Sequence, residues 1–241
     1  MYSTLFANTQ ATDRRLIVAN PWGVYIIRVD GDGYGGYNSS KLGHDMTIWH
    51  EHDCKEWHQA LDAYNSTIEQ QGDERLSNLD SWYHGELRTT LLGRAEPHIL
   101  LTELEGIAGW KMRRGVWRER NRRLVDSNEP ELVIELSRKA FGEVPDLRKP
   151  VSTLSQLAGV GPATASAVLA AYSPDIYPFF DEIVATQVPS LGDVAFTAKY
   201  YTAYAEAIRG KAAELTAICS HKSWTPHEVD QTLWAVGVRN I

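Results

Sequence analysis

The sequence predicts a mainly helical protein with a short β-containing segment near its N-terminus. Apolar residues recur at helical spacing through most of the chain after residue 54. Helix-capping signals precede several of these segments, for example at Asp53 and Thr225. Runs of β-branched and aromatic residues that suit strands occur near residues 16–18 and 24–27. Together these observations favour an all-α domain that follows a small N-terminal extension.

The predicted elements follow in chain order. We expect residues 1–80 to form the N-terminal extension, with the short strands first and then a helix from residue 54 to about residue 70. Residues 81–241 are then a helical domain that contains a helical hairpin at about residues 152–172. The other helices are predicted at residues 77–93, 96–108, 130–141, 193–208, 210–219 and 225–236.

The composition is that of an ordinary soluble globular protein. Of the 241 residues, 43% are hydrophobic and 23% are charged, and no apolar run is long enough to span a bilayer. The first residues lack a signal-peptide pattern, so we expect no secretion. Two cysteines, Cys54 and Cys219, cannot supply a disulfide framework or a four-cysteine iron–sulfur site. We therefore expect no iron–sulfur cluster and a reducing compartment, the nucleus or the cytoplasm.

Positive charge is concentrated in one segment of an otherwise acidic chain. The formal net charge is −7, yet seven of the fourteen residues at positions 110–123 are Lys or Arg. Arginines interleaved with aromatic residues suit a surface that follows a phosphate backbone. We predict Lys111, Arg113 and Arg114 as phosphate ligands, with Trp110 and Trp117 in the core. The alternative is a solvated helix face without a ligand.

Residues 154–181 carry the most informative pattern in the chain. The segment reads LSQLAGVGPATASAVLAAYSPDIYPFFD, in which Gly159 and Gly161 interrupt two helical stretches. Pro162 stands at a natural first position of the second helix. Main-chain N–H groups at such a helix start can bind an anion, and a nucleic-acid phosphate is the obvious one.

The segment from Leu157 to Ala165, LAGVGPATA, resembles the hairpin of the helix-hairpin-helix DNA glycosylases, the HhH-GPD superfamily. The resemblance is strong over residues 150–185, extends more weakly over 80–241 and is absent before about residue 80. Within the group, the sequence looks closer to little-characterised eukaryotic relatives. The resemblance implies DNA contacts from Gly159, Val160, Gly161, Ala163 and Thr164. It also implies a helical glycosylase fold and allows a monovalent cation at the main-chain carbonyls of Ser155, Leu157 and Val160, with no other cofactor required.

The resemblance also implies a catalytic acid at Asp181. Endonuclease III carries its lyase lysine 18 residues before that acid, and the same count here reaches Ala163. The expected activity is therefore that of a monofunctional glycosylase without lyase chemistry. A carboxylate can stabilise the sugar cation that forms when the glycosidic bond breaks. Tyr177, Phe179 and Phe180 are predicted to line the pocket for the extruded base. Asp181 can equally be the cap of the helix that follows it.

The histidine-rich segment at residues 44–58 allows two interpretations. His50, His52 and Cys54 alternate, so an extended chain would place them on one face as zinc ligands. Asp53 and Glu56 instead form a capping signal for a helix that starts at Cys54, and this interpretation is favoured.

The leading hypothesis is a monomeric base-excision enzyme that hydrolyses the N-glycosidic bond of damaged or mispaired bases in duplex DNA. The alternatives are a non-catalytic nucleic-acid-binding module, a protein-interaction domain and a hydrolase of free nucleosides. A membrane partner is not expected.

Overall fold

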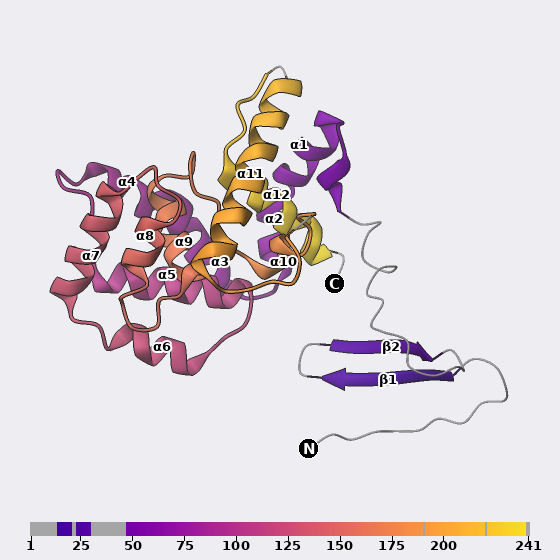
Figure 1. Cartoon of the computed structure of the whole chain (residues 1–241), viewed down its shortest axis with the longest axis horizontal. Helices are drawn as coiled ribbons and strands as arrows, with labels where there is room; N and C mark the ends of the chain where they lie inside the picture. Colours follow the sequence, from indigo (N-terminus) through magenta and orange to yellow (C-terminus); the bar gives the residue numbers. More distant parts are fainter. Residues whose placement is uncertain (1–13, 21–22, 30–46, 190, 220, 240–241) are drawn as a thin grey trace. The chain divides into compact units, whose positions relative to one another are not determined.

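The computed structural model describes residues 14–20, 23–29, 47–189, 191–219 and 221–239. The chain divides into two compact units, residues 1–45 and 46–241. In the first unit, strands β1 (Arg14–Asn20) and β2 (Gly23–Val29) pair antiparallel, with Arg14 opposite Val29 and Asn20 opposite Gly23 (Figure 1). The boundary between the units follows residue 45 and not residue 80 as expected, because the helices between these positions pack with the second unit.

The second unit is mainly helical, as predicted (Figure 1). Its first half contains the 3₁₀ turn η1 (Ile48–His50), α1 (Cys54–Asp62), α2 (Tyr64–Gln70), α3 (Glu74–Trp82), the π-helical segment η2 (Tyr83–Leu87), α4 (Arg88–Gly93) and α5 (Leu101–Arg114). It continues with α6 (Glu119–Asp126), α7 (Pro130–Gly142), α8 (Lys149–Leu154), α9 (Pro162–Tyr172), α10 (Glu182–Ala185), α11 (Ala198–Ile218) and α12 (Pro226–Arg239).

Two groups of helices make up this unit. Helix α12 packs against α1, α2, α10 and α11, whereas α5 packs against α3, α6, α7 and α9 (Figure 1). Helix α9 is the most buried of these elements, since residues 163–171 are all buried. Its alanines allow neighbouring helices to approach closely on every side. A helix that is apolar all round is expected in the centre of a protein.

Several predicted helix boundaries are confirmed and others shift. Asp53 caps α1 by accepting a hydrogen bond from the Lys55 amide. Thr225 and Glu228 form the predicted capping box at the start of α12. The helix expected from residue 96 begins instead at Leu101, and the helices expected at 193–208 and 210–219 are one helix, α11. Among the described residues, no helix has both the length and the apolar character needed to cross a bilayer.

The two cysteines form a disulfide. Cys54 at the start of α1 is bonded to Cys219 directly after α11, and 165 positions separate them in sequence. Disulfides persist mainly in oxidising surroundings. The cysteine count therefore no longer supports the expectation of a reducing compartment.

Candidate nucleic-acid interface

The turn between α8 and α9 depends on a glycine with positive φ. Gly159 has φ of +73°, a region that other residues rarely occupy. A Cβ atom at this position would lie 2.8 Å from the carbonyl oxygen of Asn121 and 2.9 Å from Val125 Cγ2. The backbone of the turn therefore lies directly against α6, and only glycine fits both the conformation and the contact.

A buried asparagine just after α6 holds the same turn by hydrogen bonds. Asn128 Oδ1 accepts a hydrogen bond from the Ala158 amide at 2.8 Å, and its Nδ2 donates to the Ala158 carbonyl at 2.9 Å. Nδ2 also donates to the carbonyl of Val125 at 2.8 Å. Asn128 thus fixes the turn to the end of α6. Nothing in the local sequence pointed to this residue, because it stands 30 positions before its partner.

The start of α9 leaves main-chain donors available. Within the described residues, the amides of Gly161, Ala163 and Thr164 have no backbone or side-chain acceptor, and Gly161 is exposed. The side chains of Ala163 and Thr164 are buried, so only their main-chain groups suit an anion. Val160 does not suit this purpose, because its amide donates to the Leu157 carbonyl at 3.2 Å. The same bond occupies one of the carbonyls predicted to hold a monovalent cation.

The predicted catalytic acid is buried and serves as a helix cap. Asp181 is 7% exposed, and its Oδ1 accepts a hydrogen bond from the Ile183 amide at 2.8 Å. Its Oδ2 lies 3.8 Å from Nε of Arg114. Burial raises the pKa of the Asp181 carboxyl group, and the nearby Arg114 guanidinium opposes this rise. The capping alternative is therefore confirmed for Oδ1, while Oδ2 faces a buried cation.

Arg114 is not positioned as a phosphate ligand, which corrects the prediction. Its side chain is fully buried, and its guanidinium carbon lies 4.5 Å from the ring centre of Trp234 and 4.9 Å from that of Trp110. Phe179 and Tyr64 complete this aromatic surround at 5.1 and 5.7 Å. The one hydrogen bond of the guanidinium runs from Nη1 to the Tyr64 hydroxyl at 3.1 Å, so Nε and Nη2 have no hydrogen-bond partner among the described residues.

The other two predicted phosphate ligands are only partly free. Arg113 forms an ion pair with Asp73 and stacks over the Trp117 ring at 5.2 Å. Lys111 is half-buried. Burial lowers the pKa of the Lys111 ammonium group, and the Asp181 carboxylate partly restores it. Lys111 and Asp181 therefore lie close enough to interact electrostatically.

The residues predicted to line a base pocket belong to the core instead. Tyr177, Phe179 and Phe180 are each at most 1% exposed. The Tyr177 hydroxyl donates to the Asp146 carbonyl, and Phe180 packs among aromatic rings of α11, including Tyr204 at 5.2 Å. These contacts leave no free aromatic wall at these positions for an incoming base.

An exposed aromatic and basic surface precedes and includes α6. Trp117 was expected in the core, but it is 45% exposed in the connection between α5 and α6, whereas Trp110 is fully buried as predicted. Arg118 and Arg120 are exposed and have no ion-pair partner within the described residues. Arg122 and Arg123 pair internally with Asp126 and Glu119, respectively. This surface, Trp117 with Arg118 and Arg120, lies at the start of α6 and just before it, and α6 contacts the Gly159 turn.

The zinc alternative for His50, His52 and Cys54 loses one of its three ligands. Cys54 is bonded to Cys219, so it has no thiolate to offer a metal. His52 Nδ1 lies 3.2 Å from a carboxylate oxygen of Glu214, and His50 ends the η1 turn. The favoured capping interpretation of Asp53 accounts for this segment.

Comparisons with known proteins identify no relative. No protein-family model matches the chain, and neither the curated proteins nor the solved structures include a match.

Proposed function

We propose that this protein binds duplex DNA through the turn between α8 and α9 and the neighbouring surface of α6. The observation that carries the proposal is the exposed start of α9, where main-chain amides without acceptors stand beside a turn braced by Gly159 and Asn128. Amides held rigidly at a helix N-terminus favour a phosphate oxygen over water. This is the binding mode expected from the resemblance to helix-hairpin-helix proteins.

The exposed surface on α6 supports the same partner. Arg118 and Arg120 offer guanidinium groups for phosphates, and the Trp117 ring offers a face on which a base can stack. Because α6 contacts the Gly159 turn, one bound strand can meet both features. The acidic remainder of the chain confines the binding to this side, which agrees with a formal net charge of −7.

Fluorescence polarisation with a labelled duplex tests this proposal. Wild-type protein should bind at low salt, and Trp117→Ala and Arg120→Ala should each weaken the affinity severalfold. Lys199→Ala is the matched control, since it removes one exposed positive charge from α11. No binding by the wild type, or equal losses in the control and the α6 variants, would reject the proposal in favour of a protein-interaction domain.

Base excision with Asp181 as the acid is the second candidate. It is favoured by the raised pKa of this carboxyl group and by an Oδ2 atom that receives no hydrogen bond from a described residue. A perturbed carboxyl group beside a partly desolvated lysine is typical of functional sites. In this candidate Arg114 moves away from Oδ2 when an extruded base enters. The activity would be hydrolysis of the N-glycosidic bond without lyase chemistry.

Base release from duplexes that contain uracil, an oxidised purine or an alkylated purine separates the two candidates. A monofunctional glycosylase would leave abasic sites that break only on alkali treatment. Asp181→Asn should abolish release and keep DNA affinity, because asparagine also caps a helix. Binding without release from any of these substrates would leave the non-catalytic module as the function.

A further inference from the structure

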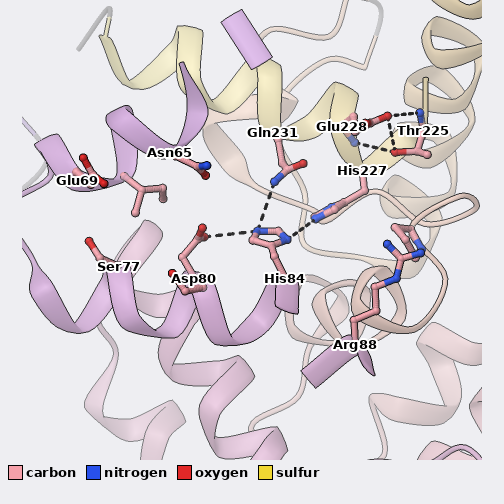
Figure 2. Close-up of a pocket in the computed structure, with 13 residues that line it drawn as sticks. Asn65, Glu69, Ser77, Asp80, His84, Arg88, Thr225, His227, Glu228 and Gln231 are labelled. Atoms are coloured by element: carbon pink, nitrogen blue, oxygen red, sulfur yellow. Dashed lines mark hydrogen bonds and ion pairs between the residues drawn. The ribbon is translucent and has the colours of Figure 1, made fainter. Parts of the chain in front are cut away.

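A polar pocket whose lining includes neither the turn nor Asp181 lies between α2, α3 and the start of α12 (Figure 2). Its cavity volume is about 560 Å³, which falls in the range of small-molecule sites. Most of its lining is polar, with Asn65 and Glu69 from α2, Asp80 from α3, His84 from η2 and His227 and Gln231 from α12. The π-helical geometry at His84 is itself frequent at functional sites.

Two histidines at the base of the pocket are fixed by a buried carboxylate. Asp230 is fully buried, and its Oδ2 accepts from His227 Nδ1 and from the Phe179 amide, both at 2.8 Å. His227 therefore carries a proton on Nδ1, and its Nε2 lies 3.4 Å from Nδ1 of His84 (Figure 2).

The other ring nitrogen of His84, Nε2, faces a carboxylate. Asp80 Oδ1 lies 3.5 Å from His84 Nε2 and already accepts from the Tyr64 hydroxyl at 2.7 Å and from Trp110 Nε1 at 2.8 Å. Burial raises the pKa of the Asp80 carboxyl group, but hydrogen bonds from His84 and Trp110 outweigh it and hold the pKa below the usual value. Asp80 is thus ionised at neutral pH, and no described residue donates to its Oδ2.

One carboxylate oxygen of the lining, Asp80 Oδ2, therefore has no donor among the described residues. Asp80 is 5% exposed, and a ligand that supplies N–H groups can donate to this oxygen and compensate for the lost hydration of the carboxylate. Glu69 adds an exposed carboxylate to the lining, whereas Arg88 is its one basic residue. A metal ion fits less well, since no three His, Cys, Asp or Glu side chains of the described residues are arranged to hold one.

We propose that this pocket binds a small organic cation, an amine or a guanidine, whose N–H groups donate to Asp80 Oδ2 and to the carboxylate of Glu69. The positive charge lies between the carboxylates of Asp80 and Glu69. The Gln231 side chain, whose Nε2 lies 3.4 Å from His84 Nε2, can turn its amide oxygen toward a further ligand donor. The site is independent of the DNA-binding surface, so either can exist without the other.

Isothermal titration calorimetry with 4-aminobutylguanidine tests the proposal, because this probe carries both cationic groups. We expect saturable binding with one site per chain, and none by the uncharged matched probe 1,4-butanediol. Absence of saturation at about 10 mM, or equal binding of the diol, would overturn the proposal, since a site of about 1 mM affinity would be nearly filled.

Variants then locate the binding. Asp80→Asn and Glu69→Gln should each weaken the affinity, Asp80→Asn by about tenfold, because hydrogen bonds to charged groups are the stronger ones. Asp80 also accepts hydrogen bonds from Tyr64 and Trp110, so Asp80→Asn can unfold the protein. Ser77→Phe on α3 fills the cavity without removing these bonds and tests the site in that case. Glu131→Gln on α7 is the control and should bind like wild type. Unchanged binding by both Glu69→Gln and Ser77→Phe would place the ligand elsewhere and reject the site.

Discussion

At the residue scale, Arg114 is the buried charge around which both groups of helices meet. It comes from α5, faces Asp181 at the start of α10 and contacts the rings of Tyr64 on α2 and Trp234 on α12. A buried charge is tolerated only when opposite charges and polar groups compensate for its lost hydration. Here one carboxylate, one hydroxyl and four aromatic faces supply that compensation.

Removing the Arg114 charge should strongly destabilise the protein. Arg114→Met leaves Asp181 buried without a counter-charge, and breaking a buried pair in this way costs about 3–5 kcal/mol in the free energy of unfolding. Urea unfolding followed by circular dichroism measures the loss. Arg114→Lys keeps the charge and should lose less. A change below about 1 kcal/mol for Arg114→Met would show that the pair contributes little.

Substitutions at the two glycines of the turn should have different effects, one on stability and the other on DNA binding. Gly159→Ala forces a Cβ into the Asn121 carbonyl at positive φ, so it should lower the free energy of unfolding by about 1–3 kcal/mol. Gly161 has φ of −97° and open space at its Cβ position, so Gly161→Ala should leave stability within about 0.5 kcal/mol.

Gly161→Ala should nevertheless weaken DNA binding, because Gly161 is exposed and an added methyl group keeps a phosphate from approaching the backbone closely. Thermal unfolding and fluorescence polarisation on the same samples test both expectations. Equal DNA affinity of Gly161→Ala and wild type would place the phosphate elsewhere.

At the element scale, the disulfide joins two helices that are far apart in sequence. It ties the start of α1 to the end of α11, and both helices pack against α12. Cross-linking such distant positions restricts the unfolded chain over a long loop.

Replacing both cysteines by serine should lower the free energy of unfolding by about 2–4 kcal/mol. Chemical denaturation of the oxidised wild type and of Cys54→Ser/Cys219→Ser measures the difference. Reducing the wild type should lower its free energy of unfolding by the same amount. The reducing agent should not change the stability of the double variant. A reducing agent that destabilises both proteins equally would contradict the assignment.

The contact between η2 and α12 should make stability depend on pH. Burial lowers the pKa of His84, and the neighbouring His227 lowers it further, while Asp80 opposes both. The folded protein therefore takes up a proton at His84 less readily than the unfolded chain does. This part of the stability is present above the unfolded pKa and is lost as the pH falls toward the lower folded pKa.

The expected result is a lower urea midpoint at about pH 5.5 than at about pH 7.5, with a smaller difference in His84→Gln. Other groups also titrate in this window, and the comparison of the two proteins isolates the His84 contribution. An identical pH dependence in both would remove His84 from the explanation.

At the scale of the whole molecule, the charge distribution should determine how DNA binding responds to salt. The chain is acidic overall, so its attraction for DNA depends on a few exposed arginines near the turn. Each phosphate contact that is lost lowers the dependence of log K on log salt concentration by about one.

Arg118→Ala/Arg120→Ala should therefore reduce the salt slope by about two relative to wild type. Binding isotherms at several salt concentrations give the slope, with Lys199→Ala as the control that should keep it. A double variant with the wild-type slope would show that these arginines do not contact phosphates.

Local patterns predicted the helical class and most helix ends because capping and periodicity act within a few residues. The Asp53 cap, the Thr225–Glu228 capping box, α7 and the two helices around Gly159 all depend on interactions between near neighbours. The site was predicted less well. Arg114, Trp117 and Phe179 were assigned by residue type, and residue type does not say which face of a helix or loop becomes buried.

The sequence by itself determined that this is a helical protein with a glycine-cornered turn and one basic segment. Only the tertiary structure decided that Arg114 is enclosed by rings from four segments, that Asn128 holds a turn 30 residues later, and that Cys54 meets Cys219. It also decided that His84 and His227, 143 positions apart, share one pocket. The physical reason is the separation of the interacting residues along the sequence. Hydrogen bonds within a helix link residues four apart, whereas burial and side-chain pairing link residues that only the packing of helices brings together.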